Sequence, residues 1–145
     1  MTYIATFDAG TTAVKGTLVN EAGEAILSRS VELPTLCHDR CQEQAPQDWW
    51  AAFRTISRQF TEAVPAEDIQ GIIMSGQMQD LIPLDADMGP VCPAILYSDG
   101  RAGDQAAVLE EAVGSEYFLH TTGNRCDGSL PLPKLMWLKE LRPEV

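Results

Sequence analysis

The sequence predicts an α/β fold built on a mixed sheet, and three observations support this class. Three short apolar segments lie close together near the N-terminus, which favours an antiparallel meander. A segment with apolar residues at helical spacing follows them. Further extended segments come after that helix and are expected to join the same sheet. With 145 residues, 45% of them hydrophobic, the chain can bury a core, most simply as one domain.

The first three predicted strands cover 3–8, 13–20 and 24–33, with "NEAGE" as the turn between the last two. A loop is expected over 34–44. The segment "APQDWWAAFRTISRQFTEAV" then predicts a helix, with Pro46 in its first turn. Its apolar residues at helical spacing are Trp49, Phe53, Ile56, Phe60 and Val64. This face is expected to pack on the sheet as core.

Extended and helical segments follow this helix. The predicted elements are strands over 69–76, 80–87 and 93–99, a turn over 85–90, and helices over 101–114 and 132–141. The first of these strands, "IQGIIMSG", is expected to be buried because it is a nearly continuous apolar run. Gly114 is expected to end the helix before it.

The charge balance argues against some partners. With 10 Lys and Arg against 21 Asp and Glu, the formal net charge is -11. We therefore expect no nucleic-acid or anionic-membrane binding through a broad basic face. The N-terminal "MTYIATFD" lacks the pattern of a signal peptide, and no apolar run is long enough to span a bilayer. A cytoplasmic protein is expected.

Cysteine and histidine residues raise the question of a zinc site. They are Cys37, His38, Cys41, Cys92, His120 and Cys126. Structural zinc sites usually take their ligands as two closely spaced pairs, and only one such pair is present. Reduced thiols are the favoured interpretation.

The stretch "FDAGTTAVKG" places several chemically active groups around one turn. Gly10 allows close backbone approach, and amides in such a turn can cradle phosphate oxygens, to which Thr11 and Thr12 add hydroxyl donors. Asp8 is placed to hold a divalent cation through water, and Lys15 offers a point charge. No helix follows, so this is not a P-loop. The alternative is a hairpin whose Asp and Thr side chains only satisfy their own turn.

The ordered motifs resemble those of a known family. "FDAGTTAVKGTLVNEAGE" resembles the first phosphate motif of the sugar-kinase, heat-shock-protein and actin superfamily. The set "QAPQDWW", "IQGIIMSGQMQDLIPLDADMGPVCPAILYSDGRA", "TTGN" and "PLPKLMWLKELRPE" resembles the FGGY carbohydrate kinases, and among them the xylulokinases. The resemblance covers nearly the whole chain in the right order.

This resemblance implies a ribonuclease-H-like fold of the actin and hexokinase superfamily, with flanking helices on a mixed sheet. Residues 1–145 would form the N-terminal portion of the first domain, and the second, nucleotide-binding lobe is absent from this chain. ATP and sugar would lie between the two lobes. Asp8 would organise Mg²⁺, and Gly10, Thr11 and Thr12 would face the terminal phosphates. The catalytic base, an Asp later in the first lobe, would lie outside this chain.

The same resemblance assigns the sugar contacts to the "GQMQ" and "SDGR" turns. The residues are Gln77, Met78, Gln79, Asp99 and Arg101. Their amide, carboxylate and guanidinium groups suit a polyol, and Met78 would add an apolar wall. The alternative is surface-loop residues, with Arg101 in a salt bridge to Asp99 or Asp104. Xylulokinase-like sequences usually carry His at the position of Gln79, so the sugar stays open between xylulose and another ketose or polyol.

Two functions follow as hypotheses. The first is the N-terminal fragment of an ATP-dependent sugar kinase, whose parent enzyme phosphorylates a ketopentose hydroxyl. The second is a non-catalytic sugar-binding or interaction module. The isolated chain is expected to be inactive. We also expect self-association, or a homodimer, through the apolar end at 132–141; its apolar residues are Leu135, Trp137, Leu138 and Leu141.

Overall fold

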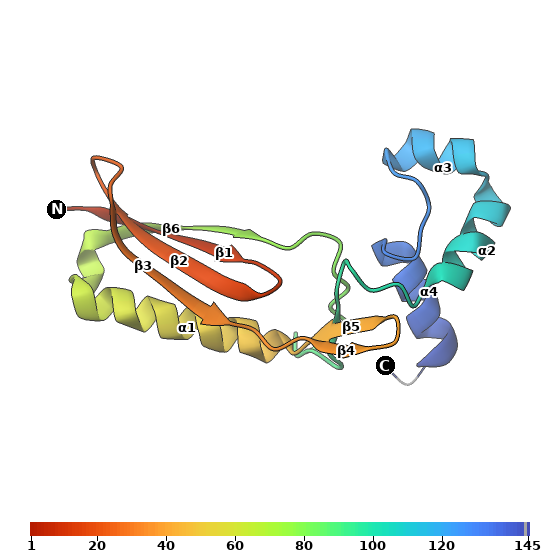
Figure 1. The fold of residues 1–145 in the computed structure, drawn as a ribbon, viewed down its shortest axis with the longest axis horizontal. Coiled ribbons are helices and arrows are strands. Elements are labelled where there is room, and N and C mark those ends of the chain that lie inside the picture. The colour runs from red at the N-terminus through yellow and green to blue at the C-terminus, as the bar shows by residue number, and fades with distance from the viewer. Residues whose placement is uncertain (144) are drawn as a thin grey trace. The chain divides into compact units, whose positions relative to one another are not determined.

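The computed structural model describes residues 1–143 and 145, which form two compact units (Figure 1). The sheet unit comprises Met1–Thr35 and Pro46–Gln77. The helix unit comprises Leu36–Ala45 and Met78–Val145. The chain therefore crosses from one unit to the other three times.

The sheet unit is built on four strands in the order β3-β2-β1-β6. Their bounds are β1 Tyr3–Ala9, β2 Ala13–Asn20, β3 Ala25–Glu32 and β6 Ile69–Gly76. β1, β2 and β3 pair as an antiparallel meander, whereas β6 lies parallel to β1 on its other side. The predicted α/β class with a mixed sheet is confirmed, and so is the predicted meander.

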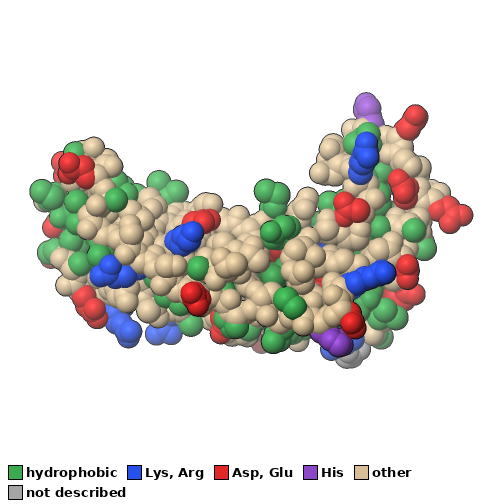
Figure 2. Space-filling view, in the orientation of Figure 1, with side chains coloured by type: hydrophobic (Ala, Val, Ile, Leu, Met, Phe, Trp, Pro, Cys, Tyr) green, Lys and Arg blue, Asp and Glu red, His purple; other side chains and the backbone are tan. Residues whose placement is uncertain are grey.

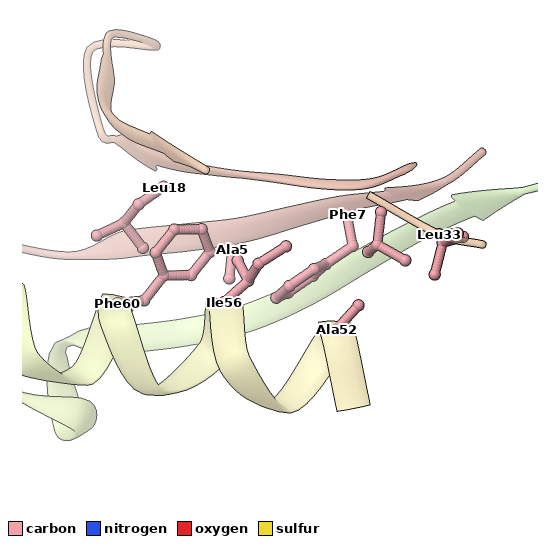
Figure 3. Close-up of a cluster of buried hydrophobic side chains, with 8 residues drawn as sticks. Ala5, Phe7, Leu18, Leu33, Ala52, Ile56 and Phe60 are labelled. Atoms are coloured by element: carbon pink, nitrogen blue, oxygen red, sulfur yellow. The ribbon is translucent and has the colours of Figure 1, made fainter. Parts of the chain in front are cut away.

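Helix α1, Pro46–Ala63, packs on one face of this sheet (Figure 3). The buried cluster contains Ala5, Phe7, Val14, Leu18, Leu33, Ala52, Ile56 and Phe60. Phe53 is only partly buried, although its ring centroid lies 4.6 Å from that of Phe7. The predicted core face is confirmed, with its centre at Ile56 and Phe60. A one-turn 3₁₀ helix, Ala66–Asp68, leads into β6.

A close contact between β2 and α1 explains the last glycine of "FDAGTTAVKG". A Cβ atom added to Gly16 would lie 2.5 Å from Ile56 Cγ2 and 3.1 Å from Phe60 Cζ. Real Cβ atoms essentially never lie 2.5 Å from another heavy atom, so a side chain here would force Ile56 or the helix that carries it to shift. Gly16 therefore serves helix packing.

Strand β6 differs from its prediction. It was expected to be buried, but Ile72, Ile73 and Met74 are 57%, 62% and 57% exposed. An apolar strand is buried on both faces only when layers cover it and neighbours flank it. Among the described residues β6 is an edge strand, with β1 as its one partner.

The helix unit contains a second, small sheet in the order β4-β5-β7. Its strands are β4 Leu36–His38, β5 Cys41–Gln44 and β7 Ala94–Ile95. The predicted loop over 34–44 is thus a hairpin. The predicted strands over 80–87 and 93–99 shrink to β7 and two isolated bridges, Leu81 to Ile95 and Leu84 to Pro90. Prolines interrupt both segments, and a proline lacks the amide hydrogen that strand pairing needs. Neither segment joins the larger sheet.

Three helices complete this unit. They are α2 Gly103–Val113, α3 Ser115–Thr122 and α4 Pro131–Leu141. Gly114 ends α2 as predicted, with a φ of 85° and its amide donating to the carbonyl of Glu110. α3 was not predicted, since it begins directly after that stop and buries only Phe118.

The charged side chains of both signs are distributed over the surface. On the face drawn in Figure 2, basic side chains are scattered among acidic ones. Within residues 1–143 and 145, no helix combines the length and apolarity needed to cross a bilayer.

Candidate functional site

The candidate phosphate turn, residues 8–12, comprises the end of β1 and the connection to β2, and it belongs entirely to the sheet unit. Ala5 and Phe7 point toward α1 (Figure 3), so the alternation along β1 directs Asp8 to the opposite face. Asp8 is exposed there. It lies opposite Lys15 on β2 and Ser75 on β6, and side chains paired in this way share one face. The structure thus brings Asp8 and Lys15 together, as expected.

Ser75 contacts the Asp8 side chain. Its Oγ donates to Asp8 Oδ1 at 3.2 Å across the parallel pair of β1 and β6. The carboxylate keeps further lone pairs for other partners, because one oxygen accepts several hydrogen bonds. Sequence reasoning missed Ser75. The only available signal was its place near the end of an apolar strand.

The turn itself is held by its own backbone. The Gly10 amide donates to the carbonyl of Ala13 at 3.1 Å, and the carbonyl of Thr12 accepts from Leu33 at 2.9 Å. The Gly10 amide is therefore engaged within the turn. The predicted set of backbone amides around the phosphate oxygens loses this donor. Hydroxyl groups of Thr11 and Thr12 and the exposed Lys15 are the side-chain donors on this segment.

Gln77 lies against this turn as well. Its backbone amide donates to the carbonyl of Ala9 at 3.1 Å, and its side-chain Nε2 donates to the carbonyl of Gly10 at 3.4 Å. Gln77 was predicted as a sugar contact. The structure places it beside the phosphate turn in the sheet unit, where it supports the backbone at Gly10, and its contact with the sugar stays a prediction.

The other predicted sugar residues belong to the helix unit. Met78 is 71% exposed, while Gln79 is partly buried and adopts a left-handed backbone with a φ of 62°. Asp80 accepts a hydrogen bond from the Tyr97 amide at 2.7 Å, which joins this turn to the segment after β7. Burial raises the pKa of the Asp80 carboxyl, against the opposing effects of that hydrogen bond and of the charge on Lys134.

Asp99 and Arg101 bind each other, as the alternative interpretation of the "SDGR" turn anticipated. Asp99 is 0% exposed. Its Oδ2 accepts from Arg101 Nη2 at 2.7 Å and from the Gln42 amide at 2.6 Å, and its Oδ1 accepts from Arg101 Nε at 2.9 Å. This bidentate pair fixes the turn from inside the unit. Direct sugar contact by either side chain stays a prediction.

Arg101 has two further partners. Its Nη2 lies 2.7 Å from Glu43 Oε1, and its guanidinium carbon lies 4.9 Å from the ring centroid of Trp137. Burial disfavours the charged form, but the hydrogen bonds and charges of Asp99 and Glu43 outweigh it and raise the pKa of Arg101. The cation therefore stays charged.

The described residues hold no cluster of metal-binding side chains, and a hollow opens on the core side of the sheet. No three His, Cys, Asp or Glu side chains in that part of the chain come together to hold an ion. In the sheet unit, a hollow of about 230 Å³ opens beside α1. It is lined by Ala5, Phe7, Ser57, Phe60, Thr61, Ala66, Ile69 and Ile72. Because Ala5 and Phe7 face α1, this hollow lies on the sheet face opposite Asp8.

Comparison with known proteins agrees with the motifs. Residues 3–145 match the profile of the FGGY family of carbohydrate kinases, N-terminal domain. Xylulose kinase of Bacillus subtilis is 37% identical over 154 residues, covering 100% of this chain and 30% of that protein. Gluconokinase of the same organism is 27% identical over 144 residues, covering 99% of this chain and 28% of the relative.

A solved structure extends the match to the fold. Ligand-bound xylulose kinase from Lactobacillus acidophilus superposes with a TM-score of 0.92 at 29% identity, covering 100% of this chain and 30% of that one. The predicted actin and hexokinase type of fold is thereby confirmed. The chain spans about 30% of the length of the relatives it matches.

Proposed function

The chain belongs to the FGGY family of carbohydrate kinases, and from that premise we propose that it is the N-terminal part of an enzyme transferring the γ-phosphate of ATP to a sugar hydroxyl. The proposal covers a protein longer than these 145 residues, since the relatives are about three times as long. The general base and the adenosine-binding lobe would lie in the remainder, as the resemblance implies.

The placement of Asp8 carries this proposal. It is an exposed carboxylate at the end of β1, held by Ser75 and followed directly by a turn with two hydroxyl side chains. A hairpin that only satisfied itself would not need the carboxylate on the face away from the core.

The donor set fits a magnesium nucleotide. Mg²⁺ usually takes one or two carboxylates and fills its other positions with phosphate oxygens and water, and Asp8 supplies one carboxylate. When bound, magnesium ATP would supply the phosphoryl group and neutralise part of its charge. Asp8 would hold the ion through water, Thr11 and Thr12 would donate to phosphate oxygens, and Lys15 would add positive charge.

For the acceptor we propose a ketopentose, with xylulose first. The support is the similarity to xylulose kinases, while the gluconokinase similarity keeps other polyols in view. The proposed sugar contacts are Gln77, Met78, Gln79, Asp99 and Arg101, and the Asp99–Arg101 pair would also shape its own turn. Gln79 can donate and accept hydrogen bonds but does not titrate, unlike the His usual in xylulokinases.

An Asp8→Asn variant of the complete kinase tests the proposal. Because charge on the moving phosphoryl group is greatest in the transition state, kcat should fall by about 100-fold or more. The KM for the sugar should change by less than about threefold. Asp87→Asn is the matched control, since Asp87 is exposed in a loop of the helix unit. Unchanged kcat in Asp8→Asn would contradict the assigned role.

A further inference from the structure

Lys134 is a buried lysine for which the proposed chemistry has no use. It lies in the first turns of α4 and is 0% exposed. Its Nζ donates to the carbonyl of Leu96 at 2.7 Å and to the carbonyl of Gln79 at 3.1 Å. The Lys134 side chain therefore connects α4 to two other segments, one at Gln79 and one at Leu96.

This position is costly for a cation. An ammonium group loses its hydration on burial, and a positive charge near the N-terminal end of a helix opposes the helix dipole. Burial lowers the pKa of Lys134, although Asp99 and Asp80 favour its charged form. An apolar side chain of similar size would pack there at lower cost. The two hydrogen bonds of Lys134, together with the charges of Asp99 and Asp80, offset that cost.

Those hydrogen bonds hold a strained turn. Gln79 has a φ of 62°, a conformation that residues other than glycine rarely adopt unless their surroundings impose it. Directly after it, Leu81 and Ile95 exchange two backbone hydrogen bonds of 2.9 Å. The carbonyl of Leu96 also accepts the amide of Asp99 at 3.0 Å. Lys134 therefore binds both the Gln79 turn and the segment that leads from Leu96 to Asp99. The backbone hydrogen bonds between Leu81 and Ile95 join these two segments next to it.

We propose that Lys134 is a positioning residue for sugar binding: its ammonium group fixes the left-handed turn that presents the Met78 and Gln79 side chains. This inference rests on the proposed function only for the sugar contact of those two side chains. We call the two hydrogen bonds from Lys134 to the carbonyls of Gln79 and Leu96 the clamp. The clamp follows from these hydrogen bonds and from the burial of Lys134.

Amide hydrogen exchange on the 145-residue chain tests the clamp without any sugar. Lys134→Met keeps the length and burial of the side chain but removes its donors. The amides of Leu81 and Ile95 should then exchange about 10- to 100-fold faster, as expected when hydrogen bonds to a charged group are lost. The Ala106 amide, which donates to the carbonyl of Ala102 at the start of α2, should stay within about twofold. Lys139→Met, at an exposed site of the same helix, is the matched control and should change neither.

Equal acceleration at all three amides would show that Lys134 only supports the whole unit, and no acceleration would show that it holds nothing; either result overturns the proposal. Should Lys134→Met not fold, the unmodified chain decides. Its Lys134 ammonium protons should exchange slowly enough to give a ¹H–¹⁵N signal with contacts to Gln79 and Leu96. Absence of that signal refutes the clamp.

The complete kinase, assayed with D-xylulose and ATP, tests the functional half. Lys134→Met should raise the sugar KM about tenfold or more, with kcat at saturating sugar changed less than about threefold. Lys139→Met should match the unmodified enzyme. Equal KM values for Lys134→Met and the unmodified enzyme would overturn the positioning role. If the unmodified enzyme phosphorylates no sugar, the proposed function fails, and the exchange measurement still decides the clamp.

Discussion

Replacing Gly16 by Ala should destabilise the sheet unit, although it adds only one methyl group. The added Cβ would lie 2.5 Å from Ile56 Cγ2, 3.1 Å from Phe60 Cζ and 3.2 Å from Phe7 Cε1. Carbon atoms in favourable contact are about 3.5 to 4.0 Å apart, so the neighbours must retreat by about 1 Å. Ile56, which the added Cβ would meet first, is 0% exposed and does not line the hollow beside α1, so it has little room to move.

The magnitude follows from two opposing effects. Overpacking a filled core costs about 1 to 3 kcal/mol. Replacing glycine by alanine also restricts the unfolded chain, which returns about 0.4 to 1 kcal/mol. Because a separation of 2.5 Å is far inside the contact distance, the overpacking cost should fall in the upper half of its range, about 2 to 3 kcal/mol, and the net loss in the free energy of unfolding should be about 1 to 2.6 kcal/mol.

Urea unfolding followed by circular dichroism measures this loss. Gly76→Ala is the control, because a Cβ there meets its neighbours at an ordinary 3.6 Å and should change stability by less than about 0.5 kcal/mol. Ile56→Leu moves the methyl group that causes the clash, so Gly16→Ala should cost less in that background. A Gly16→Ala chain as stable as the original, or a cost independent of residue 56, would refute this account of β2 and α1.

Two further predictions concern stability and the isolated chain. Asp99→Ala should lower the free energy of unfolding by about 3 to 5 kcal/mol in urea melts, because it leaves the buried Arg101 cation without its main partner. Asp104→Ala, at an exposed site, should cost less than about 0.5 kcal/mol. Comparable losses in the two variants would contradict a buried pair of Asp99 and Arg101. The 145-residue chain alone should give no ATP-dependent sugar phosphorylation in a coupled assay, and turnover by the pure chain would show that we assign the chemistry to the wrong residues. Light scattering on the same sample should detect self-association, since Leu135 and Leu141 are 51% and 56% exposed, and a strictly monomeric chain would contradict that expectation.

The sheet unit was the more predictable part from sequence. Its strands are short apolar runs with clear turns, and the Ile56 and Phe60 face of α1 has regular helical spacing, so local pattern and final structure agree. The burial of β6 was predicted wrongly, because an apolar run does not reveal which neighbours a strand has in the described chain. In the helix unit, prolines and short elements weaken the periodic signal, and both the β4–β5 hairpin and α3 escaped prediction.

The candidate site also has one part that a local sequence motif predicts and another part that only the structure reveals. Asp8, Thr11 and Thr12 are predicted from one contiguous motif, and their role at the phosphates stays a prediction. Ser75 and Lys134 act on residues distant in the sequence, through hydrogen bonds to Asp8 and to the carbonyls of Gln79 and Leu96, and no local pattern signals such contacts. Asp99 and Arg101 were identified as a pair, but only the structure shows that they bind each other so completely.

An ATP-dependent phosphorylation assay of the complete protein tests the central claim most directly. The assay would compare D-xylulose with other ketopentoses, gluconate and glycerol, and would follow ADP release with and without each sugar. We predict sugar-dependent ADP release with a ketopentose as the best acceptor, lost in Asp8→Asn and retained in Asp87→Asn. A folded, complete protein that releases no ADP with any of these acceptors would contradict the assignment of this chain to a working sugar kinase.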